Sequence, residues 1–167
     1  MTPGLIADSI VNLCGAIGLA IAGAMLYRRD RRGALTARLV FVLGIVALLF
    51  LLRGAAWWSG NAALDRISVI PAALIPLGAL VVTEGLLRRH AHRALKAVAL
   101  FGDIIMGLVG VAAPIGIETV YTAVLSAFQL ASFAICALLL LTRDRTTLLA
   151  AENRAIGRVA VGALLMI

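Results

Sequence analysis

The sequence predicts an all-α fold, a polytopic transmembrane helix bundle with five full spans, an incomplete sixth and its N-terminus outside. Three observations support this prediction. Hydrophobic residues make up 63% of the chain and charged residues 14%, whereas a soluble domain is typically about half apolar and a quarter charged. Long apolar runs recur along the chain, and basic residues gather in every second connection between them.

The apolar runs have the length that a bilayer requires. A hydrocarbon core of about 30 Å needs roughly 20 apolar residues, and five stretches meet this length: Gly4 to Tyr27, Leu39 to Trp58, Ile67 to Leu87, Ala97 to Ile117 and Thr119 to Thr142. A sixth run, Val159 to Ile167, would cover about half of the bilayer. We therefore expect one domain over residues 1–167, which either continues past Ile167 or ends in a half-inserted segment that a partner covers.

Basic residues predict the orientation of the spans. Thirteen of the fifteen Lys and Arg residues fall in the first, third and fifth connections, while the alternate connections carry only Arg66, together with Asp65 and Glu118. Basic loops face the cytoplasm under the positive-inside rule, so the N-terminus is expected outside. The formal charge of +7 then reflects contact with anionic headgroups rather than nucleic-acid binding. We expect a multi-pass protein of the bacterial inner membrane.

Small and polar side chains mark helix-contact faces in lipid, where the hydrophobic effect does not drive helices together. On this basis the first span should bury Asp8, Asn12, Gly15 and Gly23, the fourth Asp103, Gly107, Gly110 and Pro114, and the fifth Thr122, Ser126, Gln129, Phe133 and Cys136. Pro71 and Pro76 remove backbone donors from the third span, which should therefore be kinked, with neighbouring helices or water satisfying the freed carbonyls.

Asp103 is the sharpest functional candidate. It lies roughly 10 Å along the helix from Lys96, with the apolar neighbours Phe101 and Ile104. An ionisable group inside a span is costly and needs a partner or a proton. One interpretation is a proton site, a cation site or a switch residue. The other is a structural carboxylate that caps a helix or pairs near the cytoplasmic rim, with Arg88 or Lys96 as the partner.

Other polar residues within the spans are also candidates. Glu84 precedes Arg88 by four residues, which predicts an ion pair at the membrane interface. Arg53 either snorkels outward or meets Asp8, and an outward-facing cavity lined by Asp8, Asn12 and Arg53 would suit a small molecule. Gln129 near the middle of its span is expected to make an interhelical hydrogen bond.

Sequence motifs do not point to an enzyme. The chain has no Gly-x-Ser-x-Gly, no His-Glu-x-x-His and no phosphate loop. His90 and His92 lack a third ligand nearby, so a solvated basic loop is preferred over a metal site. No histidine lies inside a span to ligate haem. The only lysine, Lys96, lies at a helix end, which argues against a retinal Schiff base in the middle of the membrane. The residues assign no cofactor.

Residues 84 to 96, Glu-Gly-Leu-Leu-Arg-Arg-His-Ala-His-Arg-Ala-Leu-Lys, join two spans. This stretch, with the span count and the outward N-terminus, resembles the N-terminal membrane input domains, of six to seven spans, of bacterial helix-turn-helix regulators or histidine kinases. The resemblance implies that a further span and a cytoplasmic effector domain would follow. Neither is present in residues 1–167, so DNA-binding and kinase activity are not carried over.

Three functions remain open at this point. The leading hypothesis is a non-enzymatic membrane sensory or signal-input module, whose helices repack when a small ligand or the lipid environment favours one arrangement. The alternative is an accessory subunit that packs against other membrane helices, in a homo-oligomer or a larger complex. The third is a small-solute or proton-coupled transporter whose path is lined by Asp103, Pro114 and Gln129.

Overall fold

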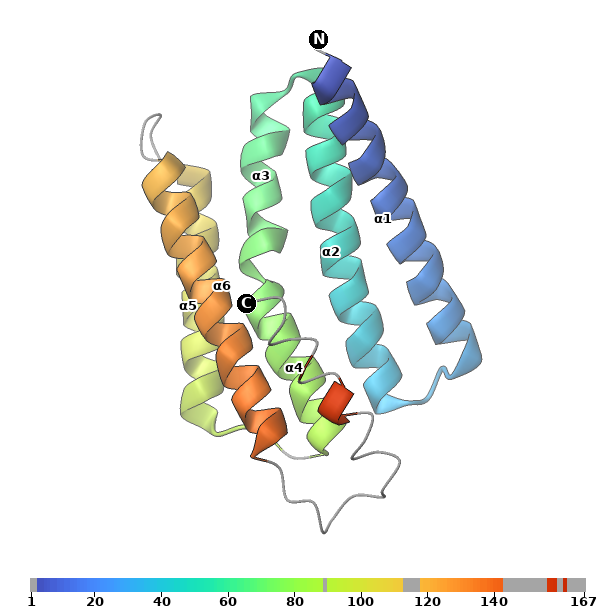
Figure 1. The fold of residues 1–167 in the computed structure, drawn as a ribbon, viewed down its shortest axis with the longest axis vertical. Coiled ribbons are helices and arrows are strands. Elements are labelled where there is room, and N and C mark those ends of the chain that lie inside the picture. The colour runs from blue at the N-terminus through green and yellow to red at the C-terminus, as the bar shows by residue number, and fades with distance from the viewer. Residues whose placement is uncertain (1–2, 89, 113–117, 143–155, 159–160, 162–167) are drawn as a thin grey trace.

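The protein is seen here in a computed structural model that describes residues 3–88, 90–112, 118–142, 156–158 and 161. Its long elements in this part of the chain are all helices (Figure 1): α1 Pro3–Arg29, α2 Ala34–Ser59, α3 Ala62–Ala73, α4 Ile75–Leu87, α5 Arg93–Ala112 and α6 Glu118–Leu141. No strand occurs among the described residues. The expected all-α class is confirmed.

Within the described residues, five helical segments are long and apolar enough to cross a membrane: Gly4–Arg29, Ala34–Ser59, Ala62–Leu87, Arg93–Ala112 and Thr119–Leu141. Three of them begin four or five residues before the predicted starts at 39, 67 and 97. The difference arises because hydropathy marks only the apolar part of a helix, whose backbone continues into polar flanks. The expected end of the fourth span, with Pro114, lies outside the described residues, as does most of the incomplete sixth run.

The α3–α4 segment forms the centre of the bundle. Figure 1 shows it between the α1–α2 pair and the α5–α6 pair. Half of its apolar 18-residue stretch is buried inside the protein, against 6% to 22% in the other four membrane-length helical segments. Helix α2 packs on both α3 and α4, whereas α5 packs mainly on α3 and α6 mainly on α4. Three helices therefore surround the point where α3 gives way to α4.

The connections between the first helices are defined by short polar residues. Gly60 ends α2 in the left-handed region at φ 66°, where a residue without a Cβ is favoured. Asn61 then caps α3, because its side-chain oxygen accepts a hydrogen bond from Ala63 N at 2.9 Å. Between α1 and α2, the Asp30 carboxylate accepts from Gly33 N at 2.9 Å and from Thr36 Oγ1 at 3.2 Å.

The packed face of α1 differs from the expected one. Ser9, Ala16 and Gly23 are buried at seven-residue intervals, while Asp8 is exposed. Ser9 Oγ donates to Gly54 O of α2 at 2.7 Å, and a Cβ at Gly54 would lie 2.8 Å from Leu13 Cγ. Only Gly23 of the four predicted residues is fully buried, because the close approach of α1 and α2 follows Ser9.

Helix α5 buries Asp103 and Gly107 as predicted. In α6 the prediction is only partly right, because Thr122 and Ser126 are exposed while Cys136 is buried. The other buried residues of α6 are Leu125, Ala137 and Leu140. The packed face of α6 is largely apolar because its main partner is α4 and not the polar face of α5.

Candidate functional site

The candidate site is the break between α3 and α4 at the centre of the bundle. Pro71 lies inside α3, and Pro76 occupies the first turn of α4, with Leu74 between the two helices. In a continuous helix residue 76 would donate its N–H to the Ala72 carbonyl, but proline has no N–H. The kink predicted from the two prolines is therefore present, and it releases backbone groups in the protein interior.

Two side chains from neighbouring helices satisfy groups at this break. Gln129 Nε2 of α6 donates to Ala72 O at 2.8 Å, which is the interhelical hydrogen bond expected of Gln129. Asp103 Oδ2 of α5 accepts from Leu77 N at 3.1 Å. Gln129 of α6 thus caps the end of α3, and Asp103 of α5 caps the start of α4.

Asp103 is almost completely enclosed, with 1% of its surface exposed. It is the eleventh residue of α5, which places it about 15 Å from Arg93 along the helix axis. On membrane insertion scales an ionised carboxylate at such a depth costs about 2.5 to 3.5 kcal/mol. A helix N-terminus stabilises an anion by up to ~2 kcal/mol. The start of α4 therefore offsets only part of the cost of a charge on Asp103.

The sequence left two interpretations of Asp103 open, and the structure places its neighbours. Its hydrogen-bond partner is a backbone amide, and Lys96 Nζ lies 2.7 Å from Glu84 Oε1. Asp103 therefore acts as a helix cap, but at the middle of the bundle and not at its rim. Sequence reasoning missed the contact between Asp103 and Leu77 N. It also named no partner for Gln129, although Pro76 identifies Ala72 O as an acceptor without its helical donor.

A polar cavity lies on the α3 side of the break and has a volume of about 220 Å³. Helices α2, α3, α5 and α6 all contribute to its wall: Arg53, Asp65, Arg66, Ser68, Val69, Ala72, Gly110, Tyr121, Thr122 and Leu125. Tyr121 Oη donates to Met106 O at 2.9 Å. Because Ala72 belongs to this wall, the polar cavity reaches the residue that Gln129 caps.

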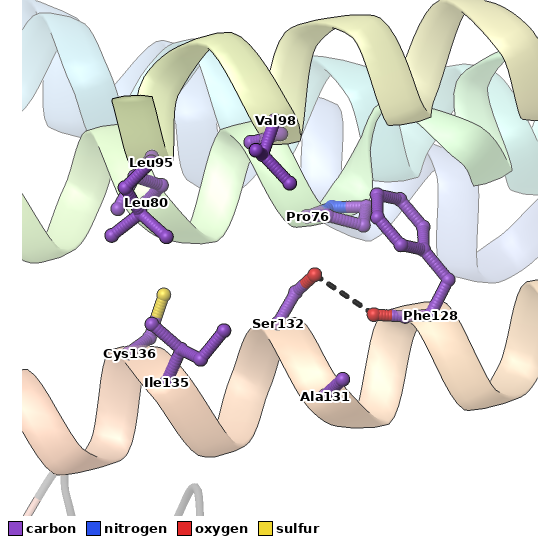
Figure 2. Close-up of a pocket in the computed structure, with 10 residues that line it drawn as sticks. Pro76, Leu80, Leu95, Val98, Phe128, Ala131, Ser132, Ile135 and Cys136 are labelled. Carbon is purple, nitrogen blue, oxygen red and sulfur yellow. Dashed lines mark hydrogen bonds between the residues drawn. The ribbon is translucent and has the colours of Figure 1, made fainter. Parts of the chain in front are cut away.

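An apolar cavity of about 160 Å³ lies on the α4 side of the break, between α4, α5 and α6. Figure 2 shows the Phe128 ring next to Pro76, and the Cys136 sulfur on the side of α6 that faces Leu80 and Leu95. The Ser132 hydroxyl turns back to Phe128 O at 2.8 Å. The cavity thus offers almost no polar atoms, in contrast to the polar cavity.

Glu84 organises the opposite end of α4. Its carboxylate accepts from Lys96 Nζ at 2.7 Å and from Ala91 N at 2.6 Å, and His90 Nδ1 lies 3.8 Å away. These contacts join the end of α4 to the start of α5 around a buried acid. Arg88, the partner predicted for Glu84, adopts a left-handed conformation at φ 51° directly after α4, and the Glu84–Arg88 pair stays a prediction.

The remaining candidates do not share one site. Arg53 lines the polar cavity, whose wall does not include Asp8 or Asn12. Asn12 Nδ2 donates to Asp8 O at 2.8 Å within α1. Arg53 therefore shares a cavity wall with residues of α3 and α6, while the hydrogen bond of Asn12 stays within α1.

Within the described residues, no three His, Cys, Asp or Glu side chains gather in a way that could hold a metal ion. Comparisons with protein-family models, with curated proteins and with solved structures found no match to the chain.

Proposed function

We propose that this chain is a multi-pass protein of the bacterial inner membrane, with its N-terminus outside and its basic loops in the cytoplasm. The five apolar helices support insertion in a membrane. The orientation rests on basic residues: Arg28 and Arg29 end α1, and Arg31 and Arg32 lie between α1 and α2. On that side the partners are anionic lipid headgroups, which attract Arg and Lys.

Within that membrane the chain acts as a non-enzymatic sensory or signal-input module. The observation that carries this proposal is the helix break held by Asp103 and Gln129. A continuous helix is stabilised by its own backbone, whereas this break depends on two side chains of other helices. A shift of α5 or α6 would release the caps and give the break a second arrangement, which is the kind of element that switching proteins use.

The polar cavity is the place where an input would act. It opens between helices that all contact the break, and it includes Ala72. A small ligand or a change in the lipid environment that favours a wider cavity would move α6 relative to α3. Because Gln129 of α6 holds Ala72 O of α3, that movement strains the cap at the break. The cavity that would receive the input therefore lies next to the helix break that would respond to it.

Distance measurement between spin labels tests this proposal. Ile67→Cys and Val120→Cys, both at exposed positions, place labels on α3 and α6 in a variant lacking Cys14 and Cys136. A sensory module should show two distances whose populations shift between acidic and alkaline buffer, or between zwitterionic and anionic nanodiscs. A control pair on α1 and α2, Ile21→Cys with Phe41→Cys, should not respond. One fixed α3–α6 distance under all these conditions would contradict the proposal.

A proton-coupled transporter is the second candidate, and the two cavities favour it. The polar cavity reaches Ala72 and the apolar cavity reaches Pro76, so they lie on either side of the break that Asp103 caps. Interrupted helices near the middle of a bundle often mark transport sites. Proton-coupled flux into liposomes that Asp103→Asn abolishes would favour transport over sensing, and equal flux in both proteins would remove this candidate.

A further inference from the structure

One oxygen of Asp103 has no hydrogen-bond partner. Among the buried side-chain nitrogen and oxygen atoms that the structure describes, Oδ1 of Asp103 alone lacks one. The other oxygen, Oδ2, accepts from Leu77 N. Buried polar groups in proteins are almost always satisfied, so a fully enclosed carboxylate oxygen without a donor points to a bound species that completes it.

No charged side chain in the described part of the chain supplies that partner. Hydrogen bonds or ion pairs to Asp103 come from none of the charged or titratable groups on the helices packed around it: Arg38 and Arg53 of α2, Asp65 and Arg66 of α3, Glu84 of α4, Arg93 and Lys96 of α5, and Tyr121 and Cys136 of α6. Lys96 is held by Glu84, and Arg38 donates to Val81 O at 3.3 Å. A carboxylate here would be charged and uncompensated.

We propose that Oδ1 of Asp103 is a proton-binding site, so that Asp103 is a neutral carboxylic acid while it caps α4. Protonation removes the charge that the start of α4 only partly stabilises. It also converts Oδ1 from an acceptor into a hydroxyl donor. The amide bond from Leu77 to Oδ2 is kept in the neutral form.

Loss of the proton requires water, and the polar cavity is its source. Gly110 lines that cavity and shares one face of α5 with Gly107 and Asp103, at steps of three and four residues. On release, the O–H bond of the acid breaks, its electron pair stays on Oδ1, and the proton passes to cavity water. The resulting carboxylate is stabilised by hydration, so ionisation favours an arrangement in which the break is open to water.

The proton is thus a ligand of the break, whether or not the module signals. Infrared spectroscopy of the full chain in liposomes at neutral pH tests it. We expect a carboxylic-acid C=O band that Asp103→Asn removes completely and that Asp30→Asn, which removes a loop carboxylate, leaves unchanged. Wild-type protein without such a band, or a band that persists in Asp103→Asn, would overturn the inference.

A measurement on the wild-type chain makes the test independent of the folding of any variant. With aspartate labelled at its carboxyl carbon with carbon-13, solid-state NMR should show one protonated carboxyl at neutral pH beside ionised ones. Spectra in which every aspartate is ionised would overturn the inference, including the case of an ionised Asp103 held by a bound cation. Failure here leaves the spin-label test of the sensory module untouched, so the two proposals can be judged separately.

Discussion

Gln129 Nε2 lies 2.8 Å from Ala72 O, the carbonyl that Pro76 deprives of its helical donor. Residues 72 and 129 are far apart in the chain, yet one side chain of α6 donates a hydrogen bond to this carbonyl at the helix break. With the bond from Leu77 N to Asp103, it makes the stability of the break depend on α5 and α6. The break is therefore the point at which three spans are coupled.

Replacing Gln129 with Leu should destabilise the bundle. The substitution removes the side-chain donor to Ala72 O in the protein interior. Interhelical hydrogen bonds in membrane proteins contribute about 0.6 kcal/mol on average and about 1.7 kcal/mol at most, and we expect a loss within this range in reversible unfolding in mixed micelles. Ser132→Ala is the control, because Ser132 bonds to Phe128 O within its own helix. Equal losses in the two variants would mean that Gln129 does not hold the break.

Two glycines on one face of α5 should respond differently to alanine. A Cβ at Gly110 would collide with Val69 and with the Tyr121 ring, whereas one at Gly107 would meet only the Ala73 Cβ at 3.9 Å. Overpacking of a tight contact costs about 1 to 3 kcal/mol. Gly110→Ala should therefore lower the unfolding midpoint in detergent, and Gly107→Ala should leave it nearly unchanged. The same response from both variants would contradict the packing of α5 on α3 and α6.

The sequence predicts the helical segments and the kink because both follow from local chemistry. Apolar runs of bilayer length identify five segments, and Pro71 and Pro76 identify the break. The periodicity of small and polar residues also predicts that Asp103 and Gly107 face the interior. These inferences require only the geometry of one helix.

The partners across helices could not be predicted in the same way. Asp103 bonds to a backbone amide, and Ser9 bonds to the Gly54 carbonyl. Neither Leu77 N nor Gly54 O is marked in the sequence, so these contacts depend on how two helices are placed. The exposed Thr122 and Ser126 illustrate the converse, because polar periodicity on α6 does not report which neighbour α6 packs against.

The contact between Glu84 and Lys96 should be asymmetric under mutation. The Glu84 side chain is 8% exposed and that of Lys96 is 39% exposed, with 2.7 Å between Oε1 and Nζ. Lys96→Met leaves a buried carboxylate without its cation, while Glu84→Gln leaves an ammonium that water can reach and an oxygen that can still accept from Ala91 N. We expect a loss of about 1 to 3 kcal/mol for the first, below the range for fully buried pairs, and less than ~1 kcal/mol for the second.

Thermal unfolding in detergent measures this difference. Arg93→Gln, a change at an exposed residue in the first turn of the same helix, serves as the control and should have little effect. A larger loss for Glu84→Gln than for Lys96→Met would show that the carboxylate does not depend on Lys96 for compensation.

The proposed orientation predicts which loops an impermeant thiol reagent reaches. In a variant lacking Cys14 and Cys136, Arg31→Cys and His92→Cys lie between α1 and α2 and between α4 and α5, whereas Asn61→Cys lies between α2 and α3. An odd number of spans separates the first two positions from the third. Intact cells should therefore be labelled at Asn61→Cys only, and inverted vesicles at Arg31→Cys and His92→Cys only. If Arg31→Cys and His92→Cys were labelled from opposite sides, α2 and the α3–α4 segment could not both span the membrane. If both were labelled from outside, the orientation would be the opposite of the proposed one.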